Sequence, residues 1–188
     1  MKTVLNYENF DLGKIKIDKK AGILFSFTEK GGNGKDYNVK DPNLAHPDLT
    51  NAIDKLKYYM AMRLNLIQPL EDIQALLGKN KEAHEKVEEL ISEAVDRCSV
   101  SGIVFVGSGS LAGVKITGSL KCNGGVVGMA TPNIIFESDK LGYEEDVQDI
   151  CEDIRKEVYN MHFKNKKAQL DLLDQAEEME KENATESN

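Results

Sequence analysis

Hydrophobic and polar residues alternate along the first 40 residues, a pattern typical of strands that bury one face. The segment GGNGK (31–35) predicts a tight reversal between two strands, because glycine and asparagine tolerate positive φ angles. The segment DYNVK (36–40) is then the expected return strand. The side chains predicted to share the inner face of the first two strands are Ile15, Ile17, Ile23, Phe25 and Phe27.

Apolar residues then recur at every third or fourth position, which predicts helices with one apolar face. Pro47 and Asp48 suit the first turn of a helix that Pro69 is expected to end. A short helical turn should stop at Gly78, and Asn80 is the expected cap of another helix. The first helix is predicted to bury Leu49, Ile53, Leu56, Met60, Leu64 and Ile67. The helix after Asn80 is predicted to bury Ala83, Val87, Leu90, Ala94 and Cys98.

A second β region runs from Val100 to Ser138, where glycines divide the chain into four short expected strands. The triplet Asn123-Gly124-Gly125 is the strongest hairpin signal, and so short a turn forces antiparallel pairing. The last helix is expected to start near Tyr143. Its predicted apolar seam consists of Val147, Ile150, Ile154, Val158, Met161, Ala168, Leu172, Ala176 and Met179.

These elements predict an α+β fold with one antiparallel sheet, built from the N-terminal and central β regions. Helices are expected on one face of the sheet, and a long helix near the C-terminus. Residues 1–163 should form a single α+β domain, and residues 164–180 a helix extension or a docking peptide. Residues 181–188 (KENATESN) are expected to be a disordered acidic tail, because this composition cannot pack.

Charge is distributed unevenly along the chain. The net charge is −8, to which residues 174–188 contribute −5, whereas residues 1–40 carry eight lysines and five acids. An acidic total argues against tight, non-specific binding to phosphate backbones, so nucleic acid is not indicated as a strong direct partner. A local contact through the basic N-terminal segment stays open.

Several features indicate a cytoplasmic protein. No apolar run reaches the length of about 18 residues that spans a bilayer, and the N-terminus lacks a secretory signal pattern. The three cysteines Cys98, Cys122 and Cys151 are an odd, widely spaced set, which favours reduced thiols with a structural role. Cys98 and Cys151 fall on the apolar stripes of predicted helices.

The familiar signatures of catalysis and of cofactor binding are missing. The segment GSGSLAG (107–113) has the glycines of a nucleotide loop but leads into the strand VKITG, so a hairpin or bulge is predicted. His46, His84 and His162 are too scattered for a metal-ligand pair. We therefore expect no catalytic residue, no metal and no cofactor. An enzyme would need carboxylates distant in sequence to converge.

The sequence from Gln169 to Leu173, QLDLL, resembles the pentapeptide with which bacterial DNA-metabolism proteins dock onto the sliding clamp of replication. The consensus of that peptide is Gln-Leu-Ser/Asp-Leu-Phe, with Leu accepted last, and this chain matches it at all five positions. The resemblance implies that Gln169 bonds at a pocket rim and that Leu172 and Leu173 fill an apolar cleft. Leu170 would make a shallower contact, and Asp171 would hold the shape of the peptide.

An uninterrupted helix is the alternative for this segment, because Leu172 falls on the same seam as Met161 and Ala168. Leu170 and Leu173 flank the seam and could widen a contact between copies of the chain. A homo-oligomer through the C-terminal helix is therefore a further hypothesis. Docking and helix formation are compatible if the helix melts on binding.

The later half of the chain is similar to a group of small, uncharacterised tailed-phage proteins, which carry a similar sheet followed by a helix and a Gln-Leu-x-Leu ending. The similarity lies in SGIVF, GVKITGSL, the Thr131-Pro132 step and EVYNMHFKNKKAQLDLL. This resemblance implies a non-enzymatic, phage-type accessory or inhibitor protein. Such a protein would engage the sliding clamp in the bacterial host cytoplasm, as part of host takeover at DNA replication.

A ligand-sequestering protein is the alternative function. An oligomer with a small, glycine-rich, lysine-bearing β domain could trap an anionic nucleotide signal of host defence. The side chains expected to contact that anion are Lys164, Lys166, Lys167 and Arg63.

Overall fold

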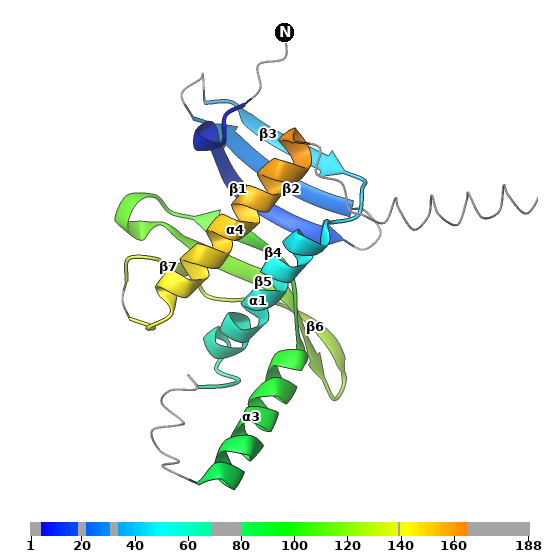
Figure 1. Ribbon diagram of the computed structural model, residues 1–188, viewed down its shortest axis with the longest axis vertical. Coiled ribbons are helices and arrows are strands. Elements are labelled where there is room, and N and C mark those ends of the chain that lie inside the picture. Colours follow the sequence, from blue (N-terminus) through cyan, green and yellow to red (C-terminus); the bar gives the residue numbers. More distant parts are fainter. Residues whose placement is uncertain (1–4, 19–21, 31–33, 69–79, 139, 165–188) are drawn as a thin grey trace, which may run out of the picture.

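The computed structural model describes residues 5–18, 22–30, 34–68, 80–138 and 140–164. Its centre is one antiparallel sheet of seven strands in the order β3-β2-β1-β4-β5-β6, with β7 pairing on another part of β5 (Figure 1). The strands are β1 (Phe10–Asp18), β2 (Gly22–Glu29), β3 (Asp36–Asp41), β4 (Cys98–Val106), β5 (Gly113–Cys122), β6 (Gly125–Ala130) and β7 (Ile134–Ile135).

The two β regions of the sequence form one sheet, as predicted. The junction is the antiparallel pairing of β1 with β4, in which Ile15 lies opposite Ile103 and both side chains are buried. Elements 80 residues apart in the chain therefore meet in the middle of the sheet, since β1 ends at Asp18 and β4 begins at Cys98.

Helices α1 (Pro47–Arg63) and α4 (Glu144–Phe163) lie side by side across the same face of the sheet (Figure 1). This arrangement confirms an α+β fold with helices on one face of an antiparallel sheet. The largest fully buried side chains are Phe10, Ile15, Leu49, Ile53, Leu56, Met60, Ile103, Val114, Ile116, Ile134, Val147 and Ile154. Among the helices that the structure describes, none has an apolar stretch long enough to cross a bilayer.

Both glycine-rich segments of the second β region are turns, as predicted. β5 ends at Cys122 and β6 begins at Gly125, so Asn123 and Gly124 make the reversal. The segment 107–113 connects β4 to β5 through the short 3-10 helix η2 (Gly109–Leu111). Because it leads into a strand, this segment has no helix dipole to offer a phosphate group.

The first helix ends earlier than Pro69, the end that the sequence predicts. α1 stops at Arg63, and Asn65 adopts a left-handed φ of 56°. The N–H of Leu66 then donates to the carbonyl of Ala61 at 2.9 Å, a bond typical of a closed helix terminus. Two residues of the predicted helix face lie beyond this end and are partly buried, Leu64 and Ile67. The predicted turn at 69–78 lies outside the described residues.

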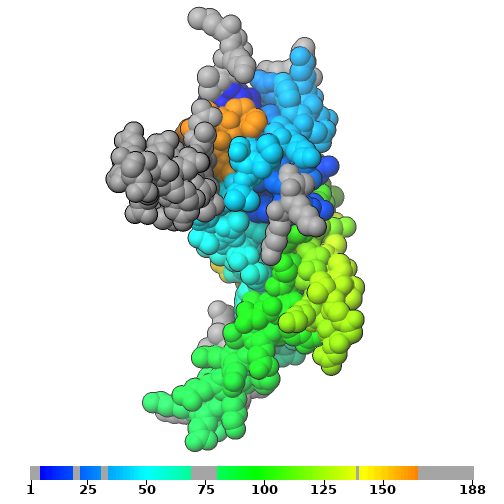
Figure 2. All heavy atoms as spheres, turned by 90° about the vertical axis from the view of Figure 1, so that its right-hand side faces the viewer, coloured from blue at the N-terminus to red at the C-terminus, as the bar shows by residue number. Residues whose placement is uncertain are grey.

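The predicted buried face of the helix after Asn80 is wrong. The Asn80 side chain does cap α3 (Lys81–Asp96), but no residue of α3 is buried and Leu90 is 62% exposed. Cys98 is buried as the first residue of β4, not as part of a helix. Figures 1 and 2 show α3 projecting away from the sheet. The spacing of apolar residues identified an apolar side of α3, but it did not indicate whether another element covers that side. The remaining residues of the predicted face are half-buried, namely Ala83, Val87 and Ala94.

The three cysteines are free thiols. Cys98 and Cys151 are buried, and Cys122 is half-buried. Burial raises the pKa of the Cys98 thiol, and it raises the pKa of the Cys151 thiol to about 12. A thiol with a raised pKa is a poor nucleophile at neutral pH, which agrees with a structural role for both residues.

Candidate functional site

The structure describes the element that leads to the predicted docking motif, Gln169–Leu173, and this segment itself lies outside the described residues. The sequence-predicted site residues in that position are Lys166, Lys167, Gln169, Leu170, Asp171, Leu172 and Leu173. The end of α4 fixes where this segment starts.

The apolar seam of α4 packs inside the subunit. Val147 and Ile154 are fully buried, and Val158 is 2% exposed against α1 and the sheet. These side chains are not accessible to another copy of the chain. The hypothesis of an oligomer through this seam now depends on its later positions, which lie outside the described residues, namely Ala168, Leu172, Ala176 and Met179.

Aromatic rings fix the last turns of α4 on strands β1 and β2. The ring centroid of Phe163 lies 5.7 Å from that of Phe10 and 5.6 Å from that of Phe27. It also lies 5.1 Å from the ring of Tyr159, whose hydroxyl donates to the carbonyl of Leu5 at 2.6 Å. Such ring pairs contribute about 0.5–1.5 kcal/mol each beyond their burial. The C-terminal end of α4 is thus a fixed part of the domain.

The predicted docking motif follows this end of α4 in the sequence. Lys164 caps α4, because its N–H donates to the carbonyl of Asn160 at 3.0 Å, and its ammonium lies 5.7 Å from the ring centroid of Tyr159. Gln169 follows five residues later in the sequence.

Arg63, an expected anion contact, is held by the loop before β7. Its Nη2 donates to the carbonyl of Asn133 at 3.3 Å. Its Nε is buried and has no hydrogen-bond partner among the described residues. Burial raises the pKa of the Tyr143 hydroxyl, and the positive charge of Arg63 partly opposes that rise. The guanidinium is therefore engaged at the start of α4.

The structure does not bring Arg63 and Lys164 together. Arg63 ends α1 near Tyr143 at the start of α4, whereas Lys164 follows the end of α4. The 20 residues of α4 extend over about 30 Å at 1.5 Å per residue. A single small nucleotide does not span that distance, so these two residues do not form one anion site.

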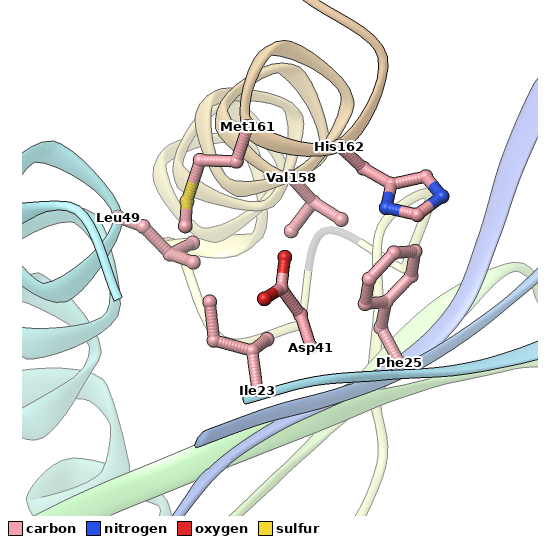
Figure 3. Close-up of a pocket in the computed structure, with 7 residues that line it drawn as sticks. All are labelled: Ile23, Phe25, Asp41, Leu49, Val158, Met161 and His162. Carbon is pink, nitrogen blue, oxygen red and sulfur yellow. The ribbon is translucent and has the colours of Figure 1, made fainter. Parts of the chain in front are cut away.

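A small cavity lies between the edge of the sheet and the two helices, and Figure 3 shows it lined by Ile23, Phe25, Asp41, Leu49, Val158, Met161 and His162. Its volume is about 10 Å³, which is room for about one water molecule. The His162 ring packs edge-on against Phe25, with the centroids 5.2 Å apart. Burial lowers the pKa of His162, and the Asp41 carboxylate opposes this shift. The cavity is too small for a metabolite.

A wider groove of about 280 Å³ runs between the exposed sides of α1 and α4. The ammonium of Lys55 and the carboxylate of Asp153 face each other across it at 3.6 Å. Sites for small molecules are mostly apolar, so a polar, open lining indicates a solvated groove between helices. The lining residues are Asp48, Asn51, Ala52, Lys55, Asp153, Lys156 and Glu157.

Three side chains near this groove could hold a metal ion. His46, Asp48 and Glu157 present ligand atoms within 4.8 Å of one another. An imidazole with two carboxylates is a donor set that divalent transition metals accept. However, Nδ1 of His46 accepts the N–H of Asp48 at 3.2 Å and so caps α1. This capping bond accounts for the position of His46 without a metal.

Glu144 is a buried carboxylate that holds the loop before α4. It is 3% exposed and accepts hydrogen bonds from the Ser138 hydroxyl at 2.6 Å and from the N–H groups of Lys140 and Leu141 at 2.8 Å each. Burial by itself raises the pKa of Glu144, but these donors outweigh it and lower the pKa to about 2. Glu144 is therefore ionised at neutral pH and stabilises the loop.

The chain matches no protein-family model, no curated protein and no solved structure.

Sequence patterns identified some of these features and missed others. Four acids of α4 lie on an exposed face, namely Glu145, Asp149, Glu152 and Asp153. The buried role of Glu144 was missed, because an acid that opens a helix is ordinarily a solvated partner of the helix dipole. The grouping of His46 with Glu157 was also missed, since no short spacing links residues on different helices.

Proposed function

We propose that this chain is a non-enzymatic accessory protein that docks on the sliding clamp of a bacterial host through Gln169–Leu173. The match of QLDLL to the clamp-docking consensus supports the proposal, as does the similarity to tailed-phage proteins. The α+β domain is the body that carries the peptide to the clamp. A body of this size, held at the docking pocket, competes with host proteins that use the same pocket.

The observation that carries the proposal is the fixed end of α4 at Phe163, six residues before Gln169. Phe163 is packed among the rings of Phe10, Phe27 and Tyr159, so the starting point of the segment is set by the domain. A short tether restricts where the peptide travels, and it keeps the domain beside any partner that the peptide binds.

The two adjacent leucines supply a large part of the expected affinity. Full burial of a leucine side chain contributes about 1.5–3 kcal/mol, so Leu172 and Leu173 together contribute about 3–6 kcal/mol. Micromolar binding corresponds to about 8 kcal/mol. Leu170, Gln169 and the peptide backbone must supply the remainder.

The test is surface plasmon resonance of the full chain on immobilised, purified bacterial sliding clamp. We expect the Leu172→Ala/Leu173→Ala variant to bind about 100-fold more weakly than wild type, or not at all. The matched control is Leu44→Ala/Leu111→Ala, since these two leucines are 59% and 68% exposed and lie outside the motif. Equal binding by wild type and both variants, or no binding by wild type, would overturn the proposal.

A further inference from the structure

The sheet has a second face that no described helix covers. Helices α1 and α4 both lie on the opposite face (Figure 1). Ile15 of β1 points toward those helices and is 1% exposed. Because side chains alternate along a strand, its neighbours Lys14 and Lys16 point to the helix-free face, and both are exposed.

Strand register brings two more lysines to the same face. The row that crosses β3, β2 and β1 consists of Lys40, Leu24 and Lys16. The row that crosses β1, β4 and β5 consists of Lys14, Val104 and Lys115. Neighbouring strands lie about 4.8 Å apart, so the two lysines of each row are about 10 Å apart, and Lys14 is about 7 Å from Lys16. We call Lys14, Lys16, Lys40 and Lys115 the lysine face.

The lysine face is positive although the chain as a whole has a net charge of −8. Within the described part of the chain, none of the four lysines forms an ion pair. The acids of this side of the sheet lie toward its margins. Asp11 pairs with Lys30 at 3.3 Å, Asp36 accepts the Thr28 hydroxyl at 2.6 Å, and Asp18 ends β1 beside the turn to β2.

The composition of this face indicates which anion it suits. Leu24 and Val104 separate the two lysines of each row. Polar side chains on the same face include Ser26, Asn38 and Thr117. The aromatic residues of the described strands share the core side of the sheet, namely Phe10, Phe25, Phe27, Tyr37 and Phe105. Single-stranded nucleic acids are bound largely by stacking of bases on aromatic rings, which this face lacks among its described residues. Duplex backbones are bound by lysines and hydroxyls without base contacts.

We propose that the lysine face binds the phosphate backbone of double-stranded DNA without sequence specificity. The basic N-terminal segment identified in the sequence supplies three of the four lysines, and β5 supplies the fourth. Binding at this face does not depend on the docking motif, because the sheet and the end of α4 are separate surfaces.

The test measures fluorescence anisotropy of a labelled duplex of about 20 base pairs, long enough for several phosphate contacts, with the full chain and no clamp present. Four lysine–phosphate contacts predict that the logarithm of the affinity falls against the logarithm of salt concentration with a slope of about −3.6. The affinity should therefore decrease about 150-fold between 50 and 200 mM salt. Replacing the four lysines by glutamine (K14Q, K16Q, K40Q and K115Q) should abolish binding.

The matched control removes the same charge from the helices by K57Q, K81Q, K86Q and K156Q, and it should retain at least a third of the wild-type affinity. The proposal is overturned if the two quadruple variants bind equally or if wild type shows no salt-dependent binding. It is also overturned if a single strand of the same sequence, or a vesicle rich in anionic lipid, binds more tightly than the duplex. Because the assay contains no clamp, its failure leaves the docking proposal unaffected.

Discussion

A Cβ atom on Gly102 would lie 2.0 Å from the carbonyl oxygen of Ile15. Gly102 follows an irregularity in the β4–β5 register after Val100, and it lies opposite Lys16 in the pairing of β1 with β4. That pairing is where the N-terminal and central β regions join. A glycine is needed at this position because only its bare backbone allows β4 to approach β1 so closely.

Gly102→Ala should therefore destabilise the fold by about 1–3 kcal/mol or more, since the β1 backbone cannot move without disturbing the sheet. Urea denaturation followed by circular dichroism measures the loss. Gly128→Ala is the matched control, because this strand glycine has no atom within 4 Å of its added Cβ. Equal urea midpoints of unfolding for the two variants would contradict the close approach of β4 to β1.

Glu144→Gln should destabilise the protein at neutral pH, because a neutral amide is a weaker acceptor for the Ser138 hydroxyl and the loop N–H groups. The pKa of Glu144 is lowered from 4.5 to about 2 in the folded protein. Its stabilisation is thus complete above pH 4.5 and is lost as the pH falls toward 2. The full shift in the pKa of Glu144 corresponds to about 3 kcal/mol in the free energy of unfolding.

Thermal unfolding between pH 2 and pH 7 tests the role of Glu144. The difference in stability between wild type and Glu144→Gln should shrink as the pH falls below 4.5. The exposed neighbour Glu145→Gln serves as the control for charge at the start of α4. A difference that stays constant over this range would contradict the buried, ionised carboxylate.

Leu56→Ala and Leu90→Ala should differ sharply in stability, although both sequence positions belong to apolar helix faces. Leu56 is fully buried in α1, so its truncation should cost about 2–5 kcal/mol. Leu90 is 62% exposed on α3, so its truncation should cost less than about 0.5 kcal/mol. Chemical denaturation of the two variants measures both. A large loss for Leu90→Ala would mean that something covers α3.

His162 should titrate below the ordinary histidine pKa of 6.5, because partial desolvation of the ring, which packs against Phe25, disfavours its charged form more than Asp41 favours it. The folded protein then binds fewer protons than the unfolded chain, so protonation of His162 lowers stability as the pH falls through 6.5. The NMR chemical shift of the ring protons reports the midpoint. A midpoint at or above 6.5 would contradict the packing in Figure 3.

The sheet could be predicted because strands and tight turns are indicated by residues that are close together in the sequence. Alternation placed Ile15 and Phe25 on an inner face, and the turn at Asn123-Gly124 set antiparallel pairing. The apolar face of α1 was predicted in the same way. The end of α1 was misplaced because a left-handed Asn65 stops the helix before Pro69, and asparagine signals that conformation only weakly.

Features that depend on contacts between distant elements could not be predicted. The spacing of apolar residues in α3 shows which side of the helix is apolar. Whether that side is buried depends on another element of the fold, which the spacing does not specify. Lys14 and Lys115 share one face only because both strands pair with β4 in a particular register. His46 and Glu157 meet only because α1 and α4 pack together.

Isothermal titration of the full chain with purified bacterial sliding clamp, with and without a competing peptide, tests the central claim most directly. The competitor is a synthetic peptide of residues 164–175, KNKKAQLDLLDQ, and its control carries alanine at the positions of Leu172 and Leu173. Docking predicts that saturating wild-type peptide abolishes the heat of binding and that the alanine peptide leaves it unchanged. Binding that survives the wild-type peptide, or a chain that gives no heat with the clamp at all, would contradict the proposed function.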